Sequence, residues 1–353
     1  MDEESMLSYD LIVTYPLPVA MNYEFSNDLS LDDIESLIVY CKLIQSAGAV
    51  ALVSERDLSL RTGLNLEFIY GVTNDPAKFY RRFYIAKKSG GSRLISEPLP
   101  NLKNLHSWIL KNILDPIPVH VASKAYHRRT TIKDNAKLHR GQESVVTFDI
   151  QDFFQSISVK LVYQLFFDIG YTRKLSTVLS RICTLDGGLP QGAPTSGAIS
   201  NRVMFSFDQS MMKFSRDRGL RYSRYADDIT FSGKNVNLFE ISSAVRSELS
   251  VLNLKINNKK SRVLSASNRQ IVTGVIVNKK INVSREFRLN VRQACYYINR
   301  YGIHGHARVI GFTEPRFLLE HLIGQVSHWR FIDPKSTEAQ RYHKMLLAER
   351  ARL

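Results

Sequence analysis

The chain has 353 residues, 44% of them hydrophobic, so it can fold into one large unit or two to three modest units with an ordinary core. Its 48 Lys and Arg outnumber its 33 Asp and Glu, and the net charge of +15 indicates a polyanionic partner. A basic surface that only keeps the protein in solution is the alternative on charge alone.

Composition also argues against several classes of protein. The longest apolar stretch, SLIVYCKLIQSAGAVALV, is interrupted by Lys42 and Gln45 and falls short of a membrane span. The first residues, MDEESM, are acidic where a signal peptide would be basic. The three cysteines lie far apart without a C-x-x-C pair, which disfavours a disulfide framework and a thiolate zinc site. We therefore expect a cytoplasmic protein in a reducing compartment, with no membrane partner.

Charge is distributed unevenly along the chain. Residues 1–60 contain two Lys or Arg against eleven Asp or Glu, which leaves residues 61–353 with a net charge of +24. Residues 279–353 contain 14 Lys or Arg against six Asp or Glu, and their pattern is helical. We expect an acidic, mostly helical N-terminal segment, and a basic surface on the rest of the chain that faces nucleic acid.

The middle of the chain alternates between strand and helix patterns. FYRRFYIAKKSGGSRLISEP contains two short alternating runs joined by Ser-Gly-Gly, which predicts a β-hairpin. A helical pattern follows in NLKNLHSWILKNIL, then a strand in SVVTFDI, helices around the glycine-rich DGGLPQGAPTSGA, and a second hairpin in RYADDITF. This order predicts an α+β fold in which helices cover one face of an antiparallel sheet.

Three aspartates are the candidates for chemistry. Asp149 ends a strand whose other residues are mostly apolar, and Asp227 and Asp228 lie side by side at the bend of the second hairpin. A buried or crowded carboxylate needs a cation, and carboxylate oxygens are ligands that magnesium prefers. For the nearby Asp152, a surface salt bridge is the alternative.

These residues resemble the palm of reverse transcriptases in chain order. The resemblance rests on FDIQDFF, LPQGAPTSGAISN and YADD, and it spans roughly residues 60–300. It implies fingers and palm in residues 61–275 and a basic helical thumb in residues 276–353, after the acidic segment of residues 1–60. It also implies RNA-directed DNA polymerase activity with deoxynucleoside triphosphates, and two Mg²⁺ ions, which Mn²⁺ can replace, held by the three aspartates.

The same resemblance assigns residues to nucleotide binding. Gln191 matches a glutamine that contacts the incoming nucleotide, and Phe154 matches an aromatic residue that crowds the sugar 2′ position. Core packing is the alternative for Phe154. Lys87, Lys88 and Arg93 flank the turn of the first hairpin, where cations can close on a triphosphate.

Two further features concern the region around the sheet. Lys260, in NNKKSRV, matches the lysine that follows the catalytic hairpin in the family and is a candidate proton donor or phosphate contact. In LPQGAPTSG we expect Gly192 to allow a close backbone approach, and Thr195 or Ser196 to cap the following helix.

Two motifs resemble those of bacterial retron reverse transcriptases. The first is Asn135-Ala136 followed by His139, and the second is Val272-Thr273-Gly274. From the residues alone, Asn135 and His139 could be a hydrogen-bonding pair on one helix face, and the Thr-Gly step a strand bend. The resemblance implies that both motifs help present a cognate non-coding RNA. For RNA binding by the thumb we select Arg288, Arg292 and Arg300.

Retron resemblance also implies a DNA product joined to the RNA 2′-hydroxyl that primes it, and a role in defence against phage with an accessory effector protein. One alternative is another bacterial reverse transcriptase, from a mobile group II intron, a diversity-generating element or an abortive-infection system. A second alternative is a polymerase-shaped scaffold that binds RNA without relying on catalysis.

Overall fold

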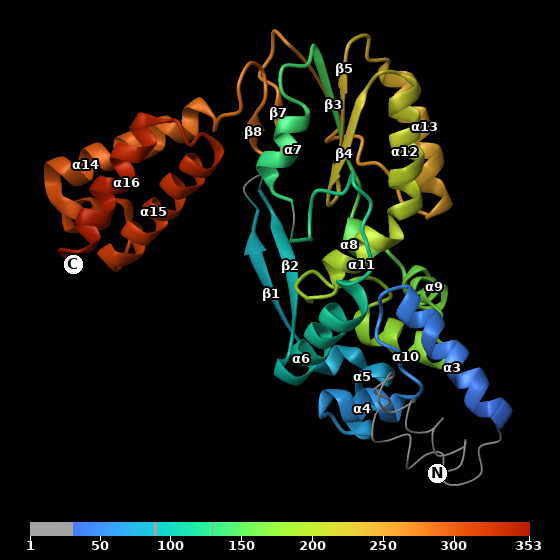
Figure 1. Ribbon diagram of the computed structural model, residues 1–353. Coiled ribbons are helices and arrows are strands. Elements are labelled where there is room, and N and C mark those ends of the chain that lie inside the picture. The colour runs from blue at the N-terminus through green and yellow to red at the C-terminus, as the bar shows by residue number, and fades with distance from the viewer. Residues whose placement is uncertain (1–30, 88–89, 129) are drawn as a thin grey trace, which may run out of the picture. The chain divides into compact units, whose positions relative to one another are not determined.

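The computed structural model describes residues 31–87, 90–128 and 130–353. The chain divides into two compact units, whose helices and strands are labelled in Figure 1. The first comprises Met1–His127, Ile150–Ser210 and Ala244–Ile256, and the second comprises Arg128–Asp149, Met211–Ser243 and Asn257–Leu353. The divisions expected at residues 60 and 275 rest on charge and on the family resemblance, not on spatial compactness, and they stay predictions.

The described part of the first unit begins with helices. Residues 1–30 lie outside the described residues, so the expectation for the whole segment of residues 1–60 stays a prediction. The helices are α3 (Leu31–Ser46), α4 (Glu55–Thr62) and α5 (Leu66–Asn74), and a 3₁₀ turn, η1 (Pro76–Phe79), follows. The Ser54 hydroxyl accepts a hydrogen bond from the Asp57 amide, which caps α4. Asn65 caps α5 in the same way.

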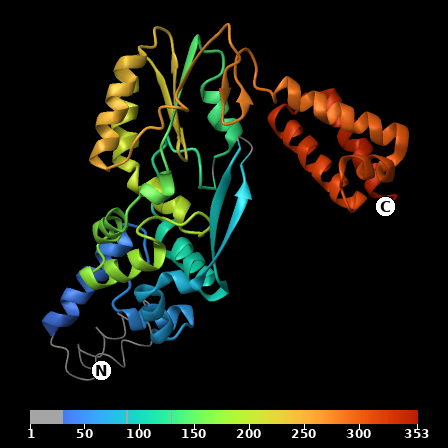
Figure 2. The same ribbon diagram turned by 180° about the vertical axis from the view of Figure 1, so that it is seen from behind.

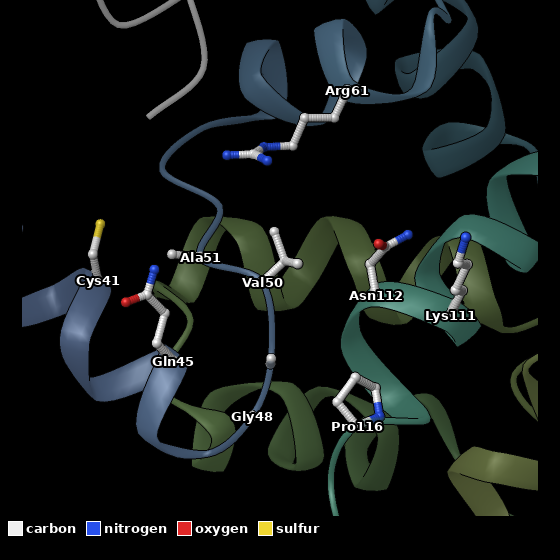
Figure 3. Close-up of a pocket in the computed structure, with 10 residues that line it drawn as sticks. Cys41, Gln45, Gly48, Val50, Ala51, Arg61, Lys111, Asn112 and Pro116 are labelled. Carbon is white, nitrogen blue, oxygen red and sulfur yellow. The ribbon is translucent and has the colours of Figure 1, made fainter. Parts of the chain in front are cut away.

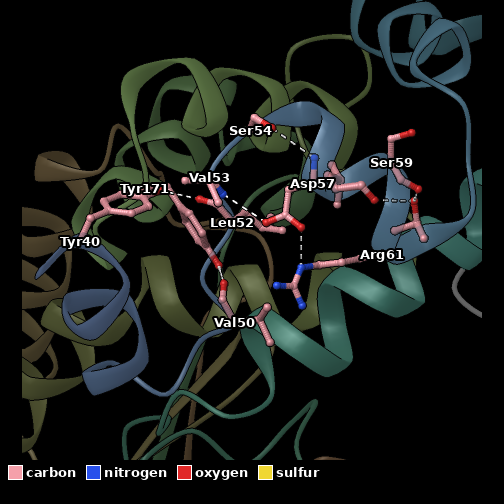
Figure 4. Close-up of polar contacts among 11 residues, drawn as sticks. Tyr40, Val50, Leu52, Val53, Ser54, Asp57, Ser59, Arg61 and Tyr171 are labelled. Atoms are coloured by element: carbon pink, nitrogen blue, oxygen red, sulfur yellow. Dashed lines mark hydrogen bonds and ion pairs between the residues drawn. The ribbon is translucent and has the colours of Figure 1, made fainter. Parts of the chain in front are cut away.

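Two tyrosines hold the link between α3 and α4 in place (Figure 4). The hydroxyl of Tyr40 donates to the carbonyl of Leu52 at 2.7 Å, and that of Tyr171 donates to the carbonyl of Val50 at 2.5 Å. Burial raises the pKa of Tyr40 to about 12, so its hydroxyl keeps the proton that it donates. Since Tyr171 lies 121 residues after Val50, this contact ties the N-terminal helices to a distant part of the same unit.

The first predicted hairpin is confirmed. Strands β1 (Tyr80–Ala86) and β2 (Ser92–Pro98) pair antiparallel with Ala86 opposite Ser92. Helix α6 (Pro100–Ile109) follows and continues into a π-helical turn, η2 (Leu110–Leu114). The other helices of this unit are α8 (Phe153–Ser156), α9 (Val159–Ile169), α10 (Arg173–Cys183) and α11 (Ser196–Val203).

A four-stranded antiparallel sheet in the order β4-β5-β3-β6 forms the centre of the second unit. Its strands are β3 (Ser144–Asp149), β4 (Arg221–Tyr225), β5 (Asp228–Gly233) and β6 (Arg262–Ser265). Of helices α12 (Phe205–Asp217) and α13 (Leu238–Val251), the parts that belong to this unit, residues 211–217 and 238–243, lie along one side of this sheet (Figures 1 and 2). Phe214 of α12 packs edge-on against Phe231 of β5, with ring centroids 6.3 Å apart. The predicted antiparallel sheet with helices on one face is therefore confirmed.

Short elements complete this unit. Helix α7 (Ile132–Leu138) precedes β3, and β7 (Ile271–Val272) pairs with β8 (Val275–Ile276) in a small hairpin. The basic C-terminal segment is helical, as predicted, and contains α14 (Arg285–Ile310), α15 (Pro315–Ile332) and α16 (Thr337–Arg350). Helix α14 breaks at Gly302, whose φ of 71° is not helical.

One hydrophobic cluster joins these C-terminal helices to the β7–β8 hairpin. It includes Val272 and Val275 from the hairpin and Leu319, Val326 and Trp329 from α15. Among the residues the structure describes, no helix has the length and apolar character needed to cross a membrane.

Candidate active site

The sheet brings the three predicted aspartates to one edge. In the β3–β5 register Asp149 lies opposite Asp228, and Asp228 pairs with Tyr225 at the end of β4. Ala226 and Asp227 form the tight turn between β4 and β5, and Ala226 has a φ of +56°. Buried residues of β4 and β5, on both sides of the turn, fix the register, so the two adjacent carboxylates cannot shift away from Asp149.

A buried arginine holds the turn between β4 and β5 through a hydrogen bond. Arg224 is 0% exposed, and its Nη1 donates to the carbonyl of Ala226 at 3.0 Å. Because this bond holds the peptide immediately before Asp227, it sets the direction in which the carboxylates leave the turn.

Lys260 reaches the site through a second turn. The amide of Asn257 donates to the carbonyl of Asp149 at 2.7 Å, and the amide of Lys260 donates to the carbonyl of Asn257 at 3.1 Å. The Nζ of Lys260 lies 2.8 Å from Oδ2 of Asp149. Lys260, predicted as the lysine that follows the acidic hairpin, is therefore in contact with Asp149, the carboxylate at the end of β3.

The electrostatics of this edge favour a bound cation. Burial raises the pKa of Asp228 to about 7, and the nearby Asp227 and Asp149 carboxylates add to the effect. The hydrogen bond to Asp149 raises the pKa of Lys260, so its ammonium group partly offsets the negative charge. The carboxylates crowd one another and have hard oxygen donors, so these residues fit a divalent cation.

No group of three His, Cys, Asp or Glu side chains within the described ranges is already arranged to hold a metal ion. At Asp149 the Lys260 ammonium takes the position of a counter-ion, at 2.8 Å. Metal binding at this edge would therefore require a rearrangement of this ion pair.

A cavity of about 560 Å³ opens beside the carboxylates. Asp149, Asp228 and Lys260 line one part of it, and Thr273 and Gly274 line another. The turn predicted to help present RNA therefore borders the same cavity as the candidate catalytic groups.

The Thr-Gly step forms the two-residue turn of the β7–β8 hairpin. Thr273 has a φ of +48° and Gly274 a φ of +80°, as tight hairpin turns of this kind require. For a β-branched residue such as Thr273 this conformation is strained. Val272 is buried, and the hydroxyl of Thr273 accepts a hydrogen bond at 3.4 Å from the side-chain Nδ2 of Asn135.

Asn135 and His139 do not share a helix face, because α7 ends at Leu138, one residue before His139. They are joined through Ser223, whose hydroxyl donates to Oδ1 of Asn135 at 2.6 Å and lies 2.8 Å from Nε2 of His139. Nδ1 of His139 lies 2.7 Å from the hydroxyl of Ser232. Both motif residues are buried, and in place of the direct pair considered as an alternative they form a network that ties α7 to β4 and β5.

The nucleotide-binding candidates Lys87, Arg93 and Gln191 lie in the first unit, at the β1–β2 turn and in the glycine-rich loop before α11. Lys87 and Arg93 are exposed at the β1–β2 turn, whereas Lys88 lies outside the described residues. The carbonyl of Gln191 accepts from the amide of Ser96 at 2.8 Å, which fixes the glycine-rich loop against β2. A Cβ at Gly192 would lie 2.7 Å from the Ser96 carbonyl oxygen, so the expected close backbone approach is confirmed.

The predicted capping of α11 by Thr195 or Ser196 is wrong. Thr195 is the N-cap residue but makes no side-chain cap; its hydroxyl lies 2.6 Å from Nδ1 of His106. The Ser196 hydroxyl donates to the carbonyl of Pro190 at 2.7 Å. Both hydroxyls serve tertiary contacts of the loop instead of the helix end.

His106 is a residue that sequence reasoning missed. It is fully buried, and its Nε2 lies 3.0 Å from the hydroxyl of Tyr80 at the start of β1. Burial lowers the pKa of His106 to about 3, so the ring is neutral and bridges β1 to Thr195 in the glycine-rich loop. A lone histidine in a helical pattern gives no sequence signal for such a bridge.

The three C-terminal arginines have different environments. Arg288 lines a cavity of about 570 Å³ together with Lys279, Lys280 and Arg285, which makes this surface strongly basic. Arg292 is paired with Glu338 of α16 at 2.7 Å.

Arg300 lies beside an aromatic cluster. Its Nη1 donates to the hydroxyl of Tyr296 at 2.5 Å, and its guanidinium lies 5.4 Å from the ring centroid of Tyr301. The structure therefore brings Arg288 alone, of the three selected arginines, to the basic cavity.

A further cavity, of about 270 Å³, lies in the first unit (Figure 3). Cys41, Gln45, Arg61 and Lys111 are among its lining residues, and none of the predicted site residues belongs to it. Nε of Arg61 donates a hydrogen bond to Oδ1 of Asp57 at 2.6 Å, so this N–H group is not available to a ligand in the cavity (Figure 4).

Comparisons with known proteins agree on one family. The family described as "Reverse transcriptase (RNA-dependent DNA polymerase)" matches residues 85–293. Retron Ec86 reverse transcriptase of Escherichia coli is 29% identical over 83% of this chain and 89% of its own length. Retron Ec83 reverse transcriptase of Escherichia coli is 32% identical over 69% of this chain and 86% of its own length.

Structural similarity to solved proteins is weaker. Telomerase from Candida albicans, in complex with a fragment of telomeric RNA, aligns over 76% of this chain and 60% of that chain. The sequence identity is 12% and the TM-score is 0.43, which is too low to support a conclusion.

Proposed function

The chain belongs to the retron reverse transcriptases, which are RNA-directed DNA polymerases, and on that basis we propose a role for each part of its site. Asp149, Asp227 and Asp228 would hold two magnesium ions, which manganese could replace. The opposition of Asp149 and Asp228 across β3 and β5, with Asp227 beside them, is the observation that supports this assignment most strongly. Bound metal would help a primer hydroxyl attack the nucleotide and would stabilise the leaving pyrophosphate.

The protein's own groups prepare this chemistry. The Arg224 contact to Ala226 holds the acidic turn. The Nζ of Lys260 lies 2.8 Å from Oδ2 of Asp149, and its role would be to donate a proton or to contact a phosphate.

Nucleotide binding is assigned to residues of the first unit. Lys87, Lys88 and Arg93 hold the triphosphate, and Gln191 contacts the incoming nucleotide. Phe154 excludes the 2′-hydroxyl of a ribonucleotide by its volume. The half-buried position of Phe154 supports this role, because part of the ring is accessible to a ligand.

For the template we propose a cognate structured RNA. The basic cavity around Lys279, Lys280, Arg285 and Arg288 supplies phosphate contacts, and Arg292 and Arg300 extend this surface along α14. The Val272-Thr273-Gly274 turn presents the RNA, and buried Asn135 and His139 act by holding that turn.

The primer would be a 2′-hydroxyl of the same RNA, so that the DNA product branches from the RNA. The position of Thr273 and Gly274 on the cavity beside Asp149 and Asp228 supports this step. We further propose a role in defence against phage together with an effector protein, by analogy with the retron relatives.

The test is the chemistry of the DNA isolated from cells that express the protein with its RNA. We expect a covalently attached ribonucleotide that survives RNase treatment, and a gel shift after treatment with a debranching enzyme. DNA with a free 5′ end would contradict RNA priming and favour another class of bacterial reverse transcriptase. Full phage protection by an Asp227→Asn variant would favour the RNA-binding scaffold.

A further inference from the structure

Tyr126, in the first unit, has a backbone conformation that tyrosine rarely adopts, with a φ of +57°. Two buried side chains hold the segment that precedes it. The hydroxyl of Ser123 donates to Oδ1 of Asn201 at 2.8 Å, and Nδ2 of Asn201 donates to the carbonyl of Ala125 at 2.8 Å. Because this clamp ends on the peptide immediately before Tyr126, it fixes the direction in which the tyrosine side chain leaves the backbone.

One side of Tyr126 packs directly on the backbone of α11. A Cβ at Gly197 would lie 2.5 Å from Cγ and 2.8 Å from Cδ1 of Tyr126, closer than real Cβ atoms approach. A glycine is therefore required in the first turn of α11 for the tyrosine to keep this position.

The ring of Tyr126 also lies beside Phe154. The two ring centroids are 5.8 Å apart with the planes tilted by 52°, an arrangement typical of favourable aromatic pairs. The ring centroid of Phe153 lies 5.6 Å from that of Phe154. The backbone carbonyl of Phe154 accepts a hydrogen bond from the amide of Leu189 at 2.9 Å. The backbone of Phe154 is thus held in place, and its ring has two aromatic neighbours. Phe153 is buried, whereas Tyr126 is 49% exposed.

The left-handed backbone conformation of Tyr126 is unfavourable for tyrosine, so the side chain must contribute something that offsets it. Glycine and asparagine adopt a φ near +57° more readily, so what tyrosine adds at this position is its ring. Strained residues that are held by their surroundings are found at ligand-binding positions. Gly197 and Phe154 are among the neighbours of the ring, and Phe154 is the residue assigned to the nucleotide sugar.

We propose that Tyr126 is a positioning residue for sugar selectivity, which holds the Phe154 ring where it meets the 2′ position of the incoming nucleotide. This inference rests on the proposed role of Phe154. Without the Tyr126 ring, Phe154 can rotate toward the vacated space, and a ribonucleotide is then excluded less strictly.

The experiment compares the kcat/KM of a deoxynucleoside triphosphate with that of the matching ribonucleoside triphosphate in single-nucleotide extension on an RNA template. Tyr126→Gly suits the backbone and removes the ring, so we expect it to lower this ratio about tenfold, mainly through a lower KM for the ribonucleotide. Tyr126→Phe keeps the ring and should keep the ratio within about twofold. Phe154→Ala combined with Tyr126→Gly should give the ratio of Phe154→Ala alone, since one residue acts through the other.

Three outcomes would overturn the proposal. In the first, Tyr126→Gly keeps the wild-type ratio while Phe154→Ala lowers it. In the second, the two reductions of the ratio multiply in the double variant, which would show that the residues act independently. An unchanged ratio in Phe154→Ala, with normal extension by the wild type, would remove the sugar role of Phe154 and this inference with it, but not the polymerase activity. Thermal melting of each variant checks the fold, and Tyr126→Asn, which also tolerates this backbone, replaces Tyr126→Gly if that variant melts early.

Discussion

Replacing His139 with alanine should destabilise the second unit by about 4 kcal/mol. The side chain is 0% exposed and makes contacts of 2.7 and 2.8 Å to the hydroxyls of Ser232 and Ser223. Ser223 keeps its bond to Asn135, but Ser232 has no other side-chain hydrogen bond in the described part of the chain. An unsatisfied buried hydroxyl costs about 1–3 kcal/mol, and removing a buried ring of this size costs about 2–3 kcal/mol more.

Urea denaturation can measure this change in the second unit alone. The chain has two tryptophans, and Trp329 is buried in the core of the second unit. In a Trp108→Phe background, Trp329 fluorescence therefore reports the unfolding of that unit. With an m-value of roughly 2.5 kcal/mol/M, the midpoint should fall by about 1.5 M.

An exposed histidine of the same unit serves as the control. His304→Ala should move the midpoint by no more than about 0.2 M, since surface substitutions usually change stability by less than about 0.5 kcal/mol. An unchanged midpoint in His139→Ala, together with lost RNA binding, would refute the buried network and make His139 a direct RNA contact.

Three other substitutions test separate parts of the account. Asp227→Asn should lower DNA synthesis at least a hundredfold and leave RNA binding nearly unchanged in a filter-binding assay, because it removes a metal ligand and not a phosphate contact; equal loss of both would indicate misfolding. Lys260→Met should also lower synthesis, yet change the free energy of unfolding by less than about 1 kcal/mol, because the Lys260 side chain is 59% exposed; a larger loss of stability would make its role structural. Arg288→Gln should reduce the salt dependence of RNA binding by about one unit of slope and Arg292→Gln, whose arginine is paired with Glu338, by less; the opposite order would place the RNA away from the basic cavity.

Local patterns were sufficient to predict most of the fold. The alternating runs around Ser-Gly-Gly and around Ala226 and Asp227 predicted both hairpins, because strand period and turn chemistry are properties of a few neighbouring residues. The same reasoning placed Asp149 at the end of a strand. Asp149 was grouped with Asp227 and Asp228 because crowded carboxylates need a cation. Their alignment across β3 and β5 was not predicted, since no local rule sets which distant strands pair.

What the sequence did not predict depends on contacts between distant residues. His139 meets Ser232 across 93 positions, and Thr195 meets His106 across 89. A hydroxyl next to a predicted helix start, such as that of Thr195, is wrongly assigned as a cap when it has such a distant partner. The left-handed conformation of Tyr126 likewise depends on the clamp from Asn201, 76 residues after the Ala125 carbonyl that it holds.

The most direct measurement compares Asp149→Asn with Asp152→Asn in extension of a DNA primer annealed to an RNA template, with and without Mg²⁺. Asp152 lies three residues away, is exposed, and has a φ of +44° that asparagine tolerates, so it is a matched control for the loss of one carboxylate. We predict that wild-type protein and Asp152→Asn synthesise DNA only with a divalent cation, and that Asp149→Asn retains less than about a hundredth of the wild-type rate. Extension by Asp149→Asn above that level, or wild-type extension in EDTA, would contradict the assignment of the three carboxylates to metal-dependent DNA synthesis.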